Sequence, residues 1–259
     1  MIISTKPLFL SAVVAASRRT FLSASAMATG PAPSQSCGSG KSAVVFLHGL
    51  GDTPAGWSSL EYQLPSIRKT LGGENVHYVF PPAPTIGITI NGGMEMPGWF
   101  DLYDWPIGIS AKDDTDGKVA AAQQIEKAVE KLETDMGIPP SRVVVGGFSQ
   151  GGAVALVAAY HRRQQGKVPF AGCVCLSGWL TLKDDLKVTE EVATATPLYW
   201  GHGQYDDKVL FEQQAHGVEI LRNAGVDVTD DFFPMGHMSH PQEVENMADF
   251  VEKALFPSK

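Results

Sequence analysis

The stretch VVVGGFSQGG, residues 143–152, joins a short apolar run to a run of small residues. An apolar run of this length is typical of a buried strand in a parallel sheet. The residues that follow, as far as Tyr160, are small and apolar enough for a helix packed against that sheet. Between them lies a G-x-S-x-G pattern centred on Ser149, and this context predicts a nucleophile held exposed at a strand tip. The competing interpretation is a glycine-rich turn with an incidental serine.

Apolar runs and amphipathic segments alternate along the chain on both sides of this turn. Helices and strands separated in this way predict an α/β fold with a mostly parallel sheet and helices on both faces. The gap between residues 176 and 197 leaves no room for a large cap domain. We expect strands at residues 43–47, 76–80, 142–146, 170–176, 197–201 and 226–233, and helices at residues 119–136, 150–160, 210–224 and 241–255.

A serine hydroxyl needs a base, and in such a fold an acid and then a histidine follow the serine along the chain. Two of the predicted strands run into suitable loops, HGQYDDKV and PMGHMSH. The first loop offers Asp206 or Asp207 as the acid, and the second offers His237 or His240 as the base. The residues alone leave both choices open. Asp207 is also a candidate cap of the next helix, and His240 would lie at a helix start before Pro241.

An oxyanion hole needs two backbone N–H groups. One is expected from Gln150, the residue after the serine, where a helix begins and its free N–H groups point toward the nucleophile. The other is expected from Leu50 in the loop HGLGD, residues 48–52, whose glycines allow close backbone approach. The alternative for this loop is a plain strand–helix turn.

Residues 81–105 show neither helical nor strand periodicity, and a long loop with its own apolar residues is more often functional than accidental. We therefore expect this stretch to form much of an acyl-chain groove, with Met94, Met96 and Trp99 as substrate-binding residues. For Trp99 and Phe100 the alternative, which the sequence slightly favours, is that they anchor the loop to the core.

Composition limits the classes of function. The chain has 259 residues, 44% of them hydrophobic, and a net charge of −8. Residues 1–51 contain no Asp or Glu, so the body of the protein is still more acidic, which argues against nucleic acid as the main partner. No apolar run approaches the roughly 20 residues that cross a bilayer. Cys173 and Cys175 are expected in a buried strand, and no Cys/His spacing predicts a metal site.

The first residues differ from the rest. Residues 1–26 are free of acidic residues, rich in Ser and Ala, and contain Arg18 and Arg19, a composition typical of a mitochondrial or plastid transit peptide. A secretory signal and an untargeted leader, with a second start at Met27, are the alternatives. We expect residues 1–41 to be leader and linker, and residues 42–259 to be the folded domain. The mature protein is expected in the cytoplasm unless the leader directs it to an organelle.

Several motifs, in a common order, carry a family resemblance. They are FLHGLGDTPAGW, PPAP, MPGWFDL, GGFSQGG, LSGWL, HGQYDDKV, and MGH with a later PQE. With them the chain resembles the acyl-protein thioesterases, in the phospholipase/carboxylesterase family of α/β hydrolases. The resemblance implies Ser149, Asp206 and His237 as the catalytic triad and Leu50 and Gln150 as oxyanion donors. Trp179, in LSGWL, joins the candidate substrate-binding residues.

Two positions depart from the family pattern. Gln204 stands where the family often has an acidic residue, and Asp207 stands where it usually has proline, so this loop is expected to differ locally in shape from the family's. The resemblance implies an α/β-hydrolase fold and an enzyme without cofactor or metal. Its expected substrates are S-acylated proteins, lysophospholipids or small esters, and transient contact with a membrane surface is expected. The alternatives are a small-ester carboxylesterase and a non-catalytic binding module on the same fold. The sequence does not determine the oligomeric state.

Overall fold

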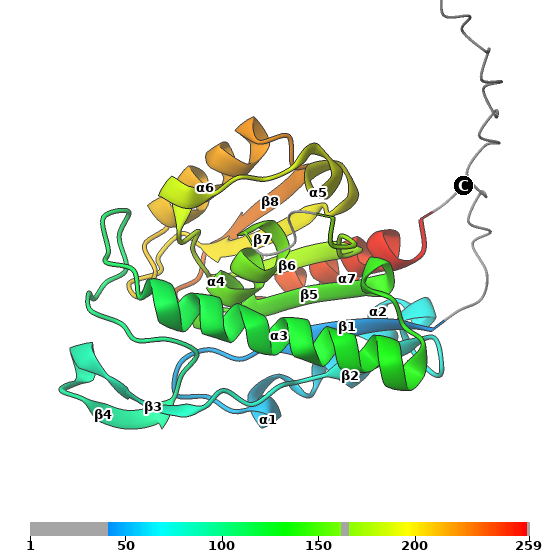
Figure 1. The fold of residues 1–259 in the computed structure, drawn as a ribbon, viewed down its shortest axis with the longest axis horizontal. Coiled ribbons are helices and arrows are strands. Elements are labelled where there is room, and N and C mark those ends of the chain that lie inside the picture. The colour runs from blue at the N-terminus through cyan, green and yellow to red at the C-terminus, as the bar shows by residue number, and fades with distance from the viewer. Residues whose placement is uncertain (1–40, 162–165, 258–259) are drawn as a thin grey trace, which may run out of the picture. The chain divides into compact units, whose positions relative to one another are not determined.

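A computed structural model describes residues 41–161 and 166–257. At its centre is a six-stranded sheet in the order β2-β1-β5-β6-β7-β8, with every neighbouring pair parallel (Figure 1). The predicted parallel sheet is confirmed, and each strand lies within a few residues of its expected bounds. The strands are β1 (Ser42–Leu47), β2 (Val76–Val79), β5 (Val143–Phe148), β6 (Gly172–Leu176), β7 (Leu198–Gly203) and β8 (Val228–Phe233).

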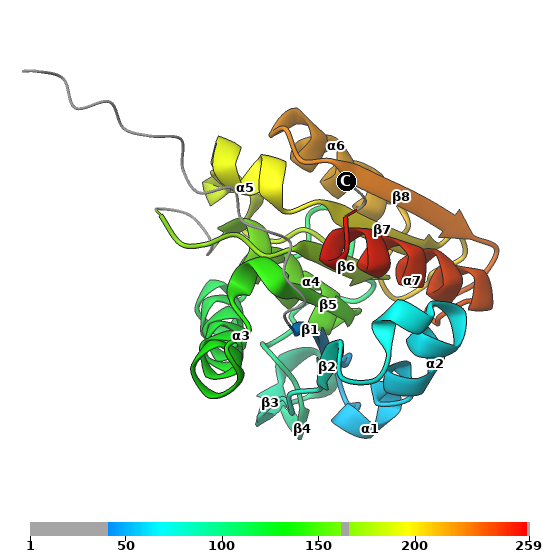
Figure 2. The same ribbon diagram turned by 90° about the vertical axis from the view of Figure 1, so that its right-hand side faces the viewer.

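Helices cover both faces of the sheet, as predicted. One face carries α3 (Thr115–Met136), α4 (Gln150–Leu156) and α6 (Glu212–Asn223). The opposite face carries α2 (Leu60–Ile67) and α7 (Pro241–Leu255), and Figure 2 shows α3 and α2 on opposite sides. The smaller elements are α1 (Pro54–Trp57), α5 (Glu190–Ala195), the 3-10 turns η1 (Lys69–Leu71) and η3 (Pro140–Arg142), and the π-helical turn η4 (Val157–His161) that continues α4.

Two apolar cores form because successive strand side chains point to opposite faces. In β1, Val45 belongs to the core under α3 and α4, whereas Val44 and Phe46 belong to the core under α2 and α7. Burial on both faces explains why the central strands β1, β5 and β6 are nearly continuous apolar runs in the sequence, whereas the edge strands β2 and β8 are only partly buried. Cys173 and Cys175 are buried in β6, as expected.

The hairpin between β2 and α3 corrects one expectation. Part of residues 81–105, predicted to lack regular structure, forms the antiparallel pair β3 (Thr85–Ile88) and β4 (Met94–Pro97), joined through η2 (Thr89–Asn91) (Figure 1). Gly92 and Gly93 adopt positive φ in the turn. Strands of four residues are too short to show a clear alternation, which is why the pattern was invisible.

The helix cap predicted at Asp207 is wrong. Helix α6 begins at Glu212, after Phe211, which makes no side-chain cap. The residues before α6 are held against another loop, because Val209 forms a β-bridge with Ile107. The other helix start is as expected: His240 is the N-cap of α7, and its side chain and that of Glu243 form a capping box.

The segment between β6 and β7 determines access to the strand ends. It holds only the 3-10 turn η5 (Lys183–Asp185) and the short helix α5. No large cap domain is therefore inserted at this point, as predicted.

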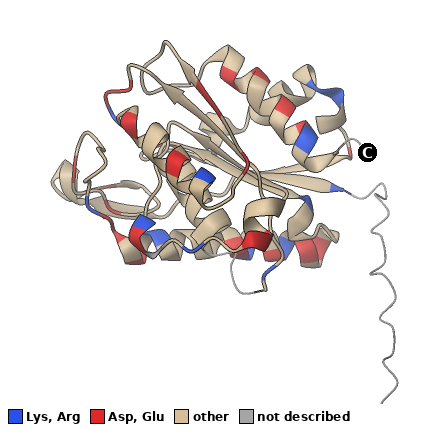
Figure 3. Ribbon diagram, turned by 90° about the horizontal axis from the view of Figure 1, so that it is seen from above, with Lys and Arg blue, Asp and Glu red and all other residues tan. Residues whose placement is uncertain are grey.

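The predicted leader and linker, residues 1–41, lie almost wholly outside the described residues, so the boundary at residue 42 and the transit peptide remain predictions. Within the described ranges, no helix is long and apolar enough to cross a membrane. Figure 3 shows Lys and Arg interspersed with Asp and Glu along the helices.

Candidate active site

The turn between β5 and α4 holds Ser149 in a strained conformation. Its φ of 55° and ψ of −120° lie outside the regions that side chains normally favour. The turn is tight enough that a Cβ on Gly147 would collide with the backbone of Gly151, and a Cβ on Gly151 would collide with the carbonyl of Leu47. Both glycines of the motif are thus required by close backbone approach, which is the strand–turn–helix context that the sequence predicts.

Three side chains from three separate loops meet at this turn. His237, in the loop after β8, has its Nε2 2.8 Å from Oγ of Ser149 and its Nδ1 2.7 Å from Oδ2 of Asp206. Asp206 follows β7, so parallel strands bring all three residues to one edge of the sheet. Ser149 is 8% exposed and Asp206 is 5% exposed, while the His237 side chain keeps more contact with solvent. A hydroxyl, an imidazole and a carboxylate in this series can act as nucleophile, base and orienting acid.

The carboxylate of Asp206 is held by its own loop. Its Oδ1 accepts hydrogen bonds from the backbone N–H groups of Lys208 and Val209, both at 2.9 Å. Burial raises the pKa of Asp206, but the hydrogen bond and charge of His237, with the two N–H groups, outweigh it and bring the pKa below its ordinary value. Asp206 is therefore ionised at neutral pH.

A second buried histidine lies behind the carboxylate. His202 is fully buried, and its Nε2 donates to the carbonyl of Val209 at 2.9 Å and lies 3.5 Å from Oδ2 of Asp206. Burial lowers the pKa of His202, so the ring is neutral. Sequence analysis missed His202, although its HG motif directly precedes the acid loop.

The structure separates the members of each ambiguous pair. The side chain of Asp207, next to Asp206, is 76% exposed and contacts Lys208. His240, which shares a loop with His237, has its Nδ1 occupied by the N–H of Gln242 at the start of α7. Of these four residues, His237 is the one that contacts Ser149, and Asp206 is the one that contacts His237.

The two candidate oxyanion donors lie beside the serine. Within residues 41–161 and 166–257, no acceptor is found for the backbone N–H of Leu50 or of Gln150. The Gln150 side chain is fixed, because its Oε1 accepts from the N–H of Trp99 and its Nε2 donates to the carbonyl of Phe100. The carbonyl of His48, just before the Leu50 loop, accepts from Nε1 of Trp99 at 2.8 Å.

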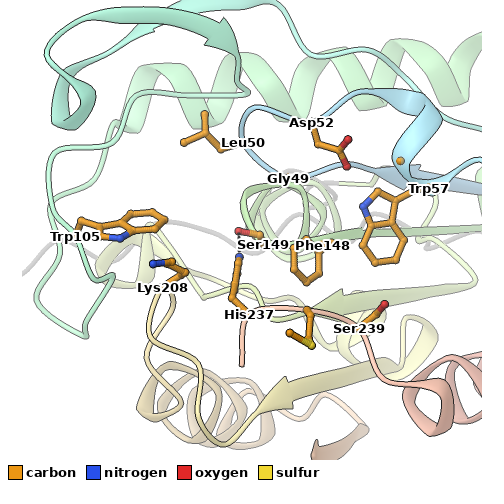
Figure 4. Close-up of a pocket in the computed structure, with 12 residues that line it drawn as sticks. Gly49, Leu50, Asp52, Trp57, Trp105, Phe148, Ser149, Lys208, His237 and Ser239 are labelled. Atoms are coloured by element: carbon orange, nitrogen blue, oxygen red, sulfur yellow. Dashed lines mark hydrogen bonds between the residues drawn. The ribbon is translucent and has the colours of Figure 1, made fainter. Parts of the chain in front are cut away.

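A pocket of about 480 Å³ opens over Ser149 (Figure 4). Figure 4 shows Trp57 and Asp52 on one side of Ser149, and Trp105 and Lys208 on the other. Trp105 ends the stretch that the sequence assigned to the groove, whereas Asp52, Trp57 and Lys208 were not singled out as substrate-binding residues, although all three stand in the quoted motifs. The pocket is lined by Gly49, Leu50, Asp52, Gly56, Trp57, Trp105, Phe148, Ser149, Lys208, His237, Met238 and Ser239.

None of the four predicted substrate-binding residues lines this pocket. Trp99 and Trp179 are buried, 2% and 4% exposed, and Trp99 anchors its loop through the hydrogen bonds described above. Met94 is 63% exposed on the β3–β4 hairpin, and Met96 packs partly buried against the core. Of residues 81–105, Trp105 is the one that lines this pocket, and the assignment of Met94, Met96 and Trp99 to an acyl-chain groove stays a prediction.

Among the described residues, no group of three or more His, Cys, Asp or Glu side chains is arranged to hold a metal ion.

Comparisons with known proteins show the family and the fold. The fold and the site define the class, the α/β hydrolases. Residues 35–255 match the family model described as Phospholipase/Carboxylesterase, and the chain belongs to this family of ester and thioester hydrolases. It is 35% identical over 216 residues to acyl-protein thioesterase 1 of Saccharomyces cerevisiae, covering 82% of this chain and 92% of that protein.

Solved structures show the same likeness. Acyl-protein thioesterase 2 of Zea mays is 30% identical with a TM-score of 0.68, over 85% of this chain and 96% of that chain. Arabidopsis thaliana SOBER1 is 26% identical with a TM-score of 0.72, over 83% of this chain and 99% of that chain. The predicted family and fold are confirmed.

Proposed function

We propose that the chain is an acyl-protein thioesterase that works through an acyl-enzyme on Ser149. The observation that carries the proposal is the continuous hydrogen-bonded series from Ser149 through His237 to Asp206, at 2.8 and 2.7 Å. The names of the relatives, acyl-protein thioesterases from yeast and maize, support the substrate class.

In the first half of the reaction, His237 removes the proton of Ser149 as Oγ attacks the acyl carbonyl carbon. Asp206 holds the imidazole with Nδ1 protonated and stabilises the imidazolium that forms. The N–H groups of Leu50 and Gln150 bind the oxyanion of the tetrahedral intermediate. Loss of one such donor costs about 3 kcal/mol of barrier. The intermediate collapses when His237 gives its proton to the leaving thiol or alcohol.

In the second half, water takes the place of the leaving group. His237 removes a proton from the water as its oxygen attacks the acyl carbon, and the same N–H groups hold the second oxyanion. Collapse of this intermediate returns the proton to Oγ of Ser149 and releases the carboxylic acid. The serine, the base and the acid are then ready for another cycle.

The pocket suits a lipid-like acyl group on a large leaving group. Trp57, Phe148 and Met238 give its wall an apolar surface beside Ser149. The mouth is not covered by a cap domain, so an acylated protein or a lysophospholipid can approach from solvent. This opening favours such substrates over small esters alone, and we expect them to be presented at a membrane surface. The location we propose is the cytoplasm, with the leader as the candidate organellar signal.

Replacement of Ser149 by Ala tests the proposal. We expect the Ser149→Ala variant to fold and to lose all but at most about a thousandth of the hydrolysis of an acyl thioester, in line with triad knockouts. A fluorophosphonate probe should label the wild type at Ser149 and leave the variant unlabelled. Unlabelled wild type without turnover would favour the binding module.

A substrate panel separates the two enzymatic alternatives. Acyl thioesters of a peptide, lysolipids and short-chain esters are to be compared by kcat/KM. Preference for the acylated peptide supports the thioesterase, whereas turnover of short esters only supports the small-ester carboxylesterase.

A further inference from the structure

The pocket over Ser149 has opposite charges at its two ends. Of the residues that line it in the described chain, Lys208 is the one Lys or Arg and Asp52 is the one carboxylate. Figure 4 shows them on opposite sides of Ser149. The Asp52 carboxylate accepts a hydrogen bond from the N–H of Thr53 at 2.7 Å, at the start of α1. One oxygen of the Asp52 carboxylate is therefore engaged locally, and Lys208 supplies the positive charge among the residues that line the pocket.

The backbone of Lys208 is fixed by the catalytic loop. Its N–H donates to Oδ1 of Asp206 at 2.9 Å, and its carbonyl accepts from the N–H of Ile107 at 2.8 Å. The ammonium lies 5.7 Å from the centre of the Trp105 ring, close enough for a cation–π contact. An otherwise flexible side chain is thus held next to the triad by two loops that are distant in the sequence.

The carboxylate of Asp207, next to the Lys208 ammonium, does not occupy the binding position that this ammonium offers to an anion. Oδ2 of Asp207 lies 3.4 Å from Nζ of Lys208, longer than a good charge-assisted hydrogen bond. The Asp207 side chain is 76% exposed, the Lys208 side chain is 42% exposed, and Asp207 does not line the pocket. Such a solvent-exposed pair contributes little, so the ammonium remains open to another anion.

We infer that Lys208 and Trp105 form a subsite for a leaving group that carries an anion, a carboxylate or a phosphate, a few bonds from the scissile thioester or ester. The inference rests on the proposed function. The leaving group departs from the side where His237 donates its proton, and Lys208 and His237 line the same pocket. The net charge of the whole protein, −8, repels anions. Lys208 therefore gives the pocket mouth a local preference for anionic leaving groups that the overall charge opposes.

Matched thioesters test the inference. The substrates are octanoyl thioesters of 3-mercaptopropanoate and of its neutral amide, with 2-mercaptoethyl phosphate as the second anion, and the released thiol is measured below micelle concentration. The quantity of interest is the ratio of kcat/KM for the anionic to the neutral thioester. The Lys208→Met variant should lower this ratio about two- to fivefold, as expected for a partly exposed ion pair. Comparison of the two anions shows which of them the subsite prefers.

Further variants separate charge from structure. Lys208→Arg should restore the ratio, Lys208→Glu should reduce it further, and Asp207→Asn should raise it about twofold by removing the competing carboxylate. Lys131→Met, at an exposed position of α3, is the matched control and should leave it unchanged. Raising the salt concentration should lower the ratio in wild type more than in Lys208→Met.

The inference is overturned if the ratio of Lys208→Met equals that of the wild type. This holds whether kcat/KM is unchanged for every substrate or falls equally for all of them, as a purely structural effect would cause. In both cases hydrolysis that depends on Ser149 would leave the proposed function intact. Hydrolysis that survives Ser149→Ala would refute the proposed function instead, whatever the ratio.

Discussion

The carboxylate of Asp206 lies 2.7 Å from Nδ1 of His237, whereas the neighbouring carboxylate of Asp207 is turned out to solvent. Two adjacent residues of one type thus have different environments, because the turn after β7 directs only the first toward the loop after β8. The N–H groups of Lys208 and Val209 complete the contacts of Asp206 and keep it ionised.

Asparagine at these two positions should therefore have unequal effects. We expect Asp206→Asn to lower kcat by about 10⁴-fold, because an amide favours the wrong tautomer of His237. Asp207→Asn should stay within about threefold on a neutral thioester, since its ion pair is exposed. Steady-state kinetics of both variants measure the difference. Equal losses would contradict the assignment of Asp206.

The two histidines of the second loop should also differ. His237→Ala should remove almost all turnover, because no other base contacts Oγ of Ser149 in the described chain. His240→Ala should keep the activity but lower the free energy of unfolding by about 1 kcal/mol, since it removes the N-cap of α7. Thioester hydrolysis and urea unfolding of both variants check this. A His240→Ala protein as inactive as His237→Ala would show that the base is misassigned.

Acyl-chain length should affect turnover through the apolar side of the pocket. Each buried methylene can contribute up to about 0.8 kcal/mol, so kcat/KM should rise from acetyl to octanoyl esters. Trp57→Ala should flatten this rise while acetyl-ester turnover persists. Met94→Ala, exposed on the hairpin and outside the pocket, is the control and should leave the slope unchanged.

The chain-length series is to be measured below micelle concentrations, with thermal unfolding as a check that Trp57→Ala is folded. Equal turnover of acetyl and octanoyl esters by the wild type would rule out an acyl groove. A flatter dependence of kcat/KM on chain length in Met94→Ala would instead place the acyl groove at the β3–β4 hairpin.

Glu243 should make stability depend on pH. It is fully buried at the start of α7, and burial, with a contribution from Asp231, raises its pKa from an ordinary 4.5 to about 8, although the N–H of His240 opposes the shift. Between these two values the folded state holds a proton that the unfolded state has lost. The contribution of Glu243 is therefore fully present below pH 4.5 and falls as the pH rises to about 8.

Glu243→Gln keeps the acceptor for His240 but does not titrate. We expect the wild type to lose more of its free energy of unfolding than Glu243→Gln between pH 6 and pH 9, measured with urea. Glu245→Gln, on the exposed side of α7, should behave as the wild type does. Parallel pH curves for the wild type and Glu243→Gln would mean that Glu243 is ionised throughout.

The sequence by itself determined the central sheet, the helices α3, α4, α6 and α7 and the elbow at Ser149, but not α1, α2 or α5. These features are local, because a buried strand is a continuous apolar run and a tight turn demands glycine at Gly147 and Gly151. It also limited the acid and the base to two residues each, since strand ends are visible in the sequence. The choice of Asp206 and His237 came from family resemblance, because neighbours in a loop look alike until the loop is folded.

Tertiary structure alone decided which residues surround the serine. Trp99 and Trp179 are aromatic residues that the sequence assigned to substrate binding, yet they are buried in the core. Trp57 and Lys208 gave no periodic signal, yet they face the pocket. Their positions depend on contacts between loops far apart in the chain, such as the bridge between Ile107 and Val209. Local sequence patterns report which residues are buried on an element, whereas pocket walls are made where separate elements meet.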